Sequence, residues 1–123
     1  MMKFGFIGMG NMGYAKLNSF SSDEIIFTCP SSQRREYINS ETNVAYAESN
    51  AECANNSKYI ILAVKPQVYD VVLKNIHDIV SPDNIIISLA PGITIADLKR
   101  KLGNDMRIVR AMPNTPALVG QGM

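Results

Sequence analysis

The chain has 123 residues, of which 46% are hydrophobic and 19% are charged, and its formal net charge is +1. This length and composition indicate one globular domain and exclude a disordered chain. The near balance of 12 Lys and Arg against 11 Asp and Glu argues against a nucleic-acid partner, because there is no basic excess to neutralise phosphates.

The longest apolar runs are short, and the first residues do not have the pattern of a secretion signal. The run "YIILAV" at 59–64 cannot cross a bilayer. The start "MMKFGFIGMG" turns glycine-rich at once and has no apolar signal core. Cys29 and Cys53 form no CxxC pair, and we expect two reduced, buried thiols. We therefore expect a cytoplasmic protein without a membrane partner.

Short β-branched or aromatic runs alternate along the chain with longer segments of helical spacing. The predicted strands are 3–7, 25–29, 43–46, 59–64, 84–90 and 107–112, and the predicted helices are 12–20, 32–38, 49–56, 67–80 and 94–102. In the fourth helix we expect one stripe to cover the sheet: Val68, Val71, Val72, Ile76 and Ile79. The alternation predicts an α/β fold with a doubly wound, mainly parallel Rossmann-type sheet and helices on both faces.

A glycine-rich loop follows the first predicted strand. Gly8, Gly10 and Gly13 have the spacing GxGxxG, and the loop opens a predicted helix, which is the context that the motif requires. Backbone N–H groups at the start of that helix would hold a dinucleotide pyrophosphate. The alternative is a glycine-rich turn that binds nothing.

The end of the second strand bears on which dinucleotide is bound. NAD enzymes usually place Asp or Glu there, whereas this chain reads "TCPSSQRR" at 28–35. Ser31, Ser32 and Gln33 can donate hydrogen bonds, and Arg34 and Arg35 can meet a 2′-phosphate. We therefore expect NADP(H) to be preferred, with NAD(H) possible. The alternative is that both arginines lie on a solvated helix face; Arg34 is the better candidate.

Three further strand ends carry Gly, Pro or small polar residues. They read "AVKPQ" at 63–67, "SLAPGIT" at 88–94 and "MPNTP" at 112–116. Pro66 suits the first turn of a helix, and Lys65 would project toward a cleft or into solvent. Because the carboxyl ends of parallel strands share one edge, these segments predict a ligand cleft there.

Other catalytic signals are missing from the sequence. His77 groups with polar residues on its helix, and we expect it at the surface. There is no HExxH, GxSxG or metal-spaced cluster, so we expect no metal and no catalytic acid or nucleophile within this chain. Hydride transfer fits this pattern, because the cofactor carries that chemistry.

Taken together, "GFIGMGNMG", "AVKPQ", "SLAPGIT" and "RAMPNTPALVGQGM" resemble pyrroline-5-carboxylate reductases over essentially the whole chain. The resemblance implies an oxidoreductase of proline biosynthesis that reduces the imine 1-pyrroline-5-carboxylate to L-proline with NAD(P)H. It implies an NAD(P)-binding Rossmann domain at 1–112. Residues 113–123 would begin the connection to a helical carboxyl-terminal domain, through which the full-length protein forms a homo-oligomer.

The resemblance also implies roles for individual residues. The pyrophosphate would be held by Ile7, Gly8, Met9, Gly10, Asn11 and Met12, the adenosine phosphate by Ser31, Ser32 and Arg34, and the ribose by Asn50. The nicotinamide half would be lined by Ala63, Val64, Lys65, Pro66, Leu89, Ala90 and Pro91, with Asn114 and Thr115 near the nicotinamide and the imine. The chain alone would be inactive. Two alternatives stay open: a non-catalytic dinucleotide-binding module, and the first domain of another imine or β-hydroxyacid dehydrogenase.

Overall fold

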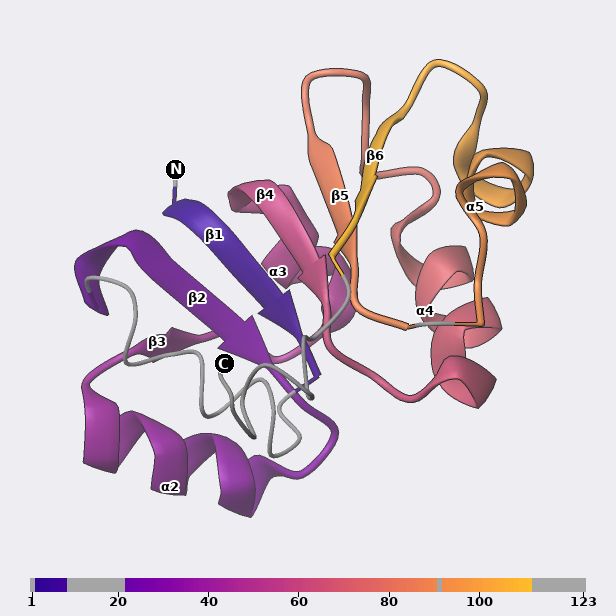
Figure 1. Ribbon diagram of the computed structural model, residues 1–123. Helices are drawn as coiled ribbons and strands as arrows, with labels where there is room; N and C mark the ends of the chain where they lie inside the picture. The colour runs from indigo at the N-terminus through magenta and orange to yellow at the C-terminus, as the bar shows by residue number, and fades with distance from the viewer. Residues whose placement is uncertain (1, 9–21, 91, 112–123) are drawn as a thin grey trace, which may run out of the picture.

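The computed structural model describes residues 2–8, 22–90 and 92–111. Over these residues six strands form one sheet: β1 (Met2–Ile7), β2 (Ile25–Thr28), β3 (Ala45–Tyr46), β4 (Ser57–Leu62), β5 (Ile85–Ser88) and β6 (Arg107–Arg110). The strand order is β3-β2-β1-β4-β5-β6, and every pairing is parallel (Figure 1). This is the doubly wound order of the Rossmann fold, so the predicted fold class is confirmed.

Helices lie on both faces of the sheet, as expected. They are α2 (Ser32–Thr42), α3 (Asn50–Asn55), α4 (Tyr69–Ile76) and α5 (Ile95–Leu102), with short 3-10 helices η1 (Ser22–Glu24) and η2 (Pro66–Val68). On one face Ile38 of α2 packs with Phe6 and Ile61. On the other face the helices α3, α4 and α5 pack on Ile7 and Ile60. Adjacent strand residues point to opposite faces, which divides the core into these two clusters.

The ends of α2 explain why it is longer than the predicted helix 32–38. The Ser31 side chain accepts a hydrogen bond from the Arg34 N–H and so caps the first turn. Asn43 adopts the left-handed conformation at φ 61° and caps the carboxyl end through the Asn39 carbonyl. The last turn is polar and carries no apolar periodicity, so the sequence pattern gave no sign of it.

The predicted stripe on the fourth helix is confirmed for Val72 and Ile76 and is wrong for Val68, Val71 and Ile79. The α4 side chains that are buried are Tyr69, Val72, Leu73 and Ile76, whereas Val68, Val71 and Ile79 are exposed. The helix is also shorter than 67–80, because Pro66–Val68 forms the 3-10 turn η2 and α4 begins only at Tyr69. Starting the helix at Tyr69 brings that aromatic ring into the core, and Val71 turns outward.

The strands end earlier than predicted at the carboxyl edge. β4 ends at Leu62 rather than 64, β5 at Ser88 rather than 90, and β6 at Arg110 rather than 112. β3 is reduced to two residues because Asn43 still belongs to the cap of α2. The loops at this edge therefore begin one or two residues sooner. The predicted helix 12–20 and the predicted domain boundary at 112/113 lie outside the described residues.

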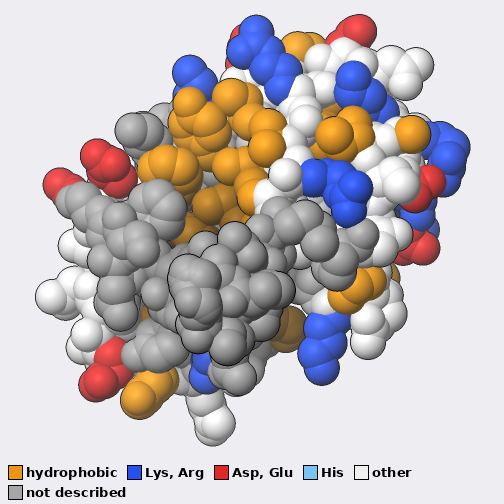
Figure 2. All heavy atoms as spheres, viewed as in Figure 1, with side chains coloured by type: hydrophobic (Ala, Val, Ile, Leu, Met, Phe, Trp, Pro, Cys, Tyr) orange, Lys and Arg blue, Asp and Glu red, His pale blue; other side chains and the backbone are white. Residues whose placement is uncertain are grey.

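Figure 2 shows apolar side chains gathered over the strands, on the face of the sheet against which α2 packs. Phe4 and Tyr59 stack there with ring centroids 5.2 Å apart. Ile87 is half-buried, and its register partner Val109 is 49% exposed. None of the described helices is long and apolar enough to cross a bilayer.

Candidate functional site

The register of the sheet places the loops after five strands on one rim. Ile7 pairs with Thr28 and Leu62, and Ser88 pairs with Leu62 and Arg110, so the last residues of five strands form one row. Residues 8, 29, 63, 89 and 111 follow directly. Backbone hydrogen bonds continue across this next row, from Gly8 N–H to the Thr28 carbonyl and from Ala63 N–H to the Ile7 carbonyl, both at 2.8 Å. The predicted convergence of strand ends is confirmed.

Gly8 is the residue of the glycine loop that the structure describes, and its geometry admits only glycine. Its φ is +93°, a conformation that side chains disfavour. A Cβ atom there would lie 2.7 Å from the Ala63 carbonyl oxygen and would overlap the Val64 side chain. The backbone can therefore turn sharply beside the loop after β4. Ile7, just before it, is a core side chain at 1% exposure, so only its backbone reaches the rim. Met9, Gly10, Asn11 and Met12 lie outside the described residues.

The structure gives the two arginines after β2 different positions. Arg35 donates from Nη1 to the Cys29 carbonyl at 2.6 Å, and its guanidinium lies 5.8 Å from the centre of the Tyr46 ring. Its Nε is buried and has no hydrogen-bond partner in the described structure. Arg35 therefore braces the loop after β2. Arg34 is half-buried in the first turn of α2, with the exposed residues Ser31 and Ser32 beside it. The alternative in which both arginines lie on a solvated helix face is therefore wrong for Arg35.

The Cys29 thiol lies among these residues and stays neutral. Burial raises the pKa of Cys29, while Ser31 and then the charges of Arg35 and Arg34 act in the opposite direction. A neutral thiol adds no negative charge to the loop after β2. Cys53 is also a free, buried thiol, and the prediction that both cysteines are buried is confirmed.

An open pocket of about 270 Å³ lies between the ends of β2 and β3 and the start of α3. Its lining comprises Thr28, Cys29, Pro30, Arg35, Glu48, Ser49, Asn50 and Asn75. Asn50 is the first residue of α3, after the cap Ser49, and its Nδ2 donates to Asn75 Oδ1 of α4 at 3.0 Å. The Asn75 contact was not foreseen, because no sequence spacing links residues 25 positions apart.

The loop after β4 borders Gly8, and the loop after β5 follows the next strand of the sheet. Ala63 and Val64 are half-buried, Lys65 is exposed and precedes η2, and Pro66 opens that helix as predicted. Leu89 is half-buried and Ala90 is buried, whereas Pro91, Asn114 and Thr115 lie outside the described residues. The pattern analysis missed Tyr69, whose hydroxyl group reaches the ends of both strands. The signal in the sequence that could have indicated its burial is the helical spacing of Tyr69 with Val72, Leu73 and Ile76.

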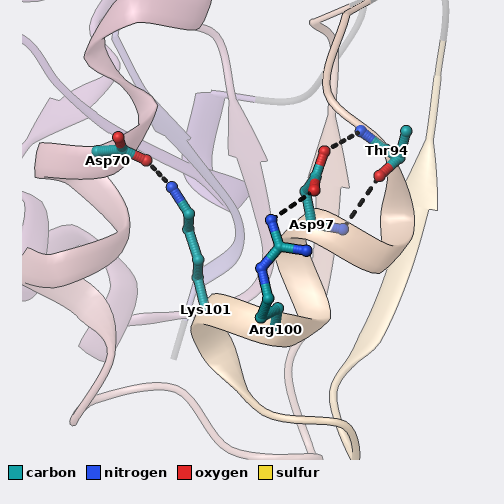
Figure 3. A network of polar contacts seen from close by, with 5 residues as sticks. All are labelled: Asp70, Thr94, Asp97, Arg100 and Lys101. Atoms are coloured by element: carbon teal, nitrogen blue, oxygen red, sulfur yellow. Dashed lines mark hydrogen bonds and ion pairs between the residues drawn. The ribbon is translucent and has the colours of Figure 1, made fainter.

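Charged side chains also meet between α4 and α5 (Figure 3). Lys101 pairs with Asp70 across the two helices, and Arg100 pairs with Asp97 at 2.6 Å. Thr94 caps α5 in a reciprocal box with Asp97, and the pKa of Asp97 is lowered by the hydrogen bonds from Thr94 and Arg100. Two hollows of about 260 and 430 Å³ lie beside this network. The Lys101–Asp70 pair links the two helices, whereas the Arg100–Asp97 pair lies within α5.

The remaining predicted groups lie away from the rim. His77 is at the surface as expected, with 55% of its side chain exposed and Nδ1 3.0 Å from Asp78 Oδ1. Among the described residues no group of three or more His, Cys, Asp or Glu side chains could hold a metal ion.

Comparison with known proteins was made for the sequence and for the fold. Residues 3–92 match the model of the family described as "NADP oxidoreductase coenzyme F420-dependent". The pyrroline-5-carboxylate reductase of Escherichia coli K12 is 39% identical over 98% of this chain and 47% of its own length. The structure of a pyrroline-5-carboxylate reductase from Coxiella burnetii superposes with a TM-score of 0.83 at 33% identity, over 96% of this chain and 46% of that one.

A third relative was solved with a ligand. The structure of Plasmodium falciparum pyrroline carboxylate reductase with NADP bound superposes with a TM-score of 0.76 at 34% identity, over 97% of this chain and 45% of that chain. The chain thus spans about half the length of the relatives it matches.

Proposed function

The chain belongs to the NADP oxidoreductase, coenzyme F420-dependent, family and within it to the pyrroline-5-carboxylate reductases, and on this premise we propose that it forms the cofactor-binding part of an enzyme that reduces 1-pyrroline-5-carboxylate to L-proline with NADPH. The observation that carries the proposal is the rim itself. Gly8 turns at a positive φ against the Ala63 carbonyl and the Val64 side chain, where any Cβ would collide, so the chain leaves β1 in the sharp turn that a dinucleotide-binding glycine loop requires.

The residues of the rim divide into parts with separate roles in this proposal. The segment 7–12 holds the pyrophosphate, and Asn50, fixed by Asn75 beside the pocket, meets the ribose. Ala63–Pro66 and Leu89–Pro91 line the nicotinamide half. Asn114 and Thr115 lie near the nicotinamide and the imine. Residues 1–112 form the domain, and 113–123 begin the connection to a further, helical domain.

Bound NADPH supplies the hydride that reduces the imine carbon, and this chain binds and orients the cofactor. For the amine to form, a proton must be held on or delivered to the imine nitrogen. We propose that this proton comes from the second half of the longer protein, or from ordered water, and that the second half also makes the homo-oligomer. The free thiols Cys29 and Cys53 support a cytoplasmic location.

The substrate proposal is tested by assaying NADPH oxidation with 1-pyrroline-5-carboxylate. We expect the 123-residue chain alone to bind cofactor but to turn over little or nothing, and a version extended to the length of its relatives to be active. Near-normal turnover by the chain alone would contradict the assignment of the proton and substrate contacts to a second half. An inactive extended protein that binds NADPH normally would favour a non-catalytic dinucleotide-binding module.

The preference for NADP(H) is proposed from Arg34, because the Arg35 guanidinium is bound to the Cys29 carbonyl. One or two charge-assisted hydrogen bonds to a 2′-phosphate give a roughly ten- to few-hundred-fold preference for NADPH over NADH. Fluorescence titration of the chain with both cofactors measures this ratio. Arg34→Ala is expected to weaken NADPH binding about tenfold or more and to leave NADH binding nearly unchanged.

A matched control for this experiment is Arg107→Ala. Arg107 is an exposed arginine at the amino end of β6, at the opposite edge of the sheet from the rim. Arg107→Ala removes one positive charge, as Arg34→Ala does, and leaves the residues of the rim unchanged. Equal affinities of the wild-type chain for the two cofactors, or equal losses in the two variants, would refute the role of Arg34.

A further inference from the structure

Tyr69 connects two strand ends at one buried point. It is the first residue of α4 and is 2% exposed. Its hydroxyl oxygen lies 3.3 Å from the Leu62 carbonyl oxygen and 2.9 Å from Ser88 Oγ. Leu62 and Ser88 are register partners at the ends of β4 and β5. A single side chain from the helix therefore contacts both strands where the rim begins.

The direction of the two hydrogen bonds follows from the donors available. A carbonyl oxygen can only accept, so Tyr69 donates its one hydroxyl proton to Leu62. The Ser88 hydroxyl then donates to the Tyr69 oxygen. Ser88 is 1% exposed, so its hydroxyl group has no access to water and relies on this partner. A phenylalanine would fill the same space but would leave both strand ends without this link.

We propose that Tyr69 is a positioning residue for the nicotinamide half of the cofactor site, an inference that rests on the proposed function. Ala63 follows Leu62, and Leu89 follows Ser88, so the hydroxyl group lies one residue behind each of the two loops that line that half. By fixing Leu62 and Ser88 relative to α4, it sets the spacing of those loops. The adenosine half, formed by the loops after β2 and β3, makes none of these contacts.

The test compares two ligands that differ in the nicotinamide half. NADPH spans the whole site, whereas 2′,5′-ADP carries only the adenosine half with its phosphates. For the Tyr69→Phe variant of the 123-residue chain, calorimetric titration is expected to show NADPH binding about fivefold weaker, as for the loss of one net hydrogen bond. The affinity for 2′,5′-ADP is expected to stay within about twofold of wild type.

Two variants separate positioning from general destabilisation. Val72→Ala removes buried atoms from the same helix without touching the hydroxyl pair, and is expected to lower the melting temperature with no selective loss of NADPH. Tyr69→Phe with Ser88→Ala removes the orphaned hydroxyl, so it is expected to regain stability over Tyr69→Phe while keeping the selective loss. Equal weakening of both ligands by Tyr69→Phe, or unchanged NADPH affinity, overturns the inference alone. Failure of the wild-type chain to bind either ligand overturns the proposed function with it.

Discussion

At the scale of single residues, the positions of the loops on the rim depend on a few side chains and on one glycine that no other residue can replace. Gly8 combines a positive φ with contact to the Ala63 carbonyl and the Val64 side chain. The Tyr69 hydroxyl and Arg35 Nη1 each bond a backbone carbonyl at or just after the end of a strand. Side chains and glycine geometry therefore set where the loops lie, and a cofactor would meet mainly backbone in this part of the rim.

Gly8→Ala tests how strict this geometry is. The added methyl group must either strain a left-handed backbone or push the loop after β4 outward, and the two effects together should cost about 3 kcal/mol of unfolding free energy. We also expect NADPH binding to be lost, because Gly8 belongs to the segment proposed to hold the pyrophosphate and the displaced loop after β4 is proposed to line the nicotinamide half. Urea denaturation and cofactor titration measure the two effects.

Gly92→Ala is the matched control for that substitution. Among the residues that the structure describes, none comes within 4 Å of a Cβ atom placed at Gly92, and its φ is not in the left-handed region. The unfolding free energy should therefore stay within about 0.5 kcal/mol of wild type. Similar losses in the two variants would show that alanine is poorly tolerated at glycines generally and that the Gly8 contacts are not the cause.

At the scale of elements, the sequence predicted which segments are strands and helices better than it predicted where they begin. Buried parallel strands such as β4 are apolar on successive residues, so their presence is plain from the sequence. The limits are set by hydrogen bonds that carry no apolar signal: the left-handed cap at Asn43 and the 3-10 turn that follows Lys65. After this turn α4 buries Tyr69 and Leu73 together with the predicted Val72 and Ile76, and Val71 is exposed.

The same limit applies to the site. Strand ends that share a rim follow from topology, so the positions of Gly8, Ala63 and Leu89 relative to one another could be predicted. Contacts between side chains on different elements could not. Asn50 meets Asn75, and Tyr69 meets Ser88, only because α3, α4 and β5 are packed at particular angles that no spacing in the sequence encodes.

At the scale of the whole molecule, the core between the sheet and the helices on the α3 side excludes water. Cys53 of α3 is fully buried, and its Sγ lies 3.7 Å from the Phe6 carbonyl oxygen of β1. Burial, with the nearby charge of Glu52, raises the pKa of Cys53 from 9.0 to about 12. Water reaches this thiol only when α3 leaves the sheet, so its ionisation reports on unfolding of the central part of the fold.

The stability of the molecule should therefore fall in alkaline solution. Below pH 9 the thiol is protonated in both the folded and the unfolded states, and its contribution to stability is complete. Between pH 9 and about 12 only the unfolded state releases the proton, so the folded state is progressively disfavoured. This one group makes the unfolding free energy fall by up to about 1.4 kcal/mol per pH unit in that range. Urea denaturation at pH 8, 9 and 10 measures the slope, and Cys53→Ala supplies the control, because it removes this thiol and keeps every other ionisable side chain. We expect the Cys53→Ala curve to be flatter above pH 9. Parallel curves would mean that the Cys53 thiol titrates alike in the folded and unfolded states and that the region around α3 opens to water without global unfolding.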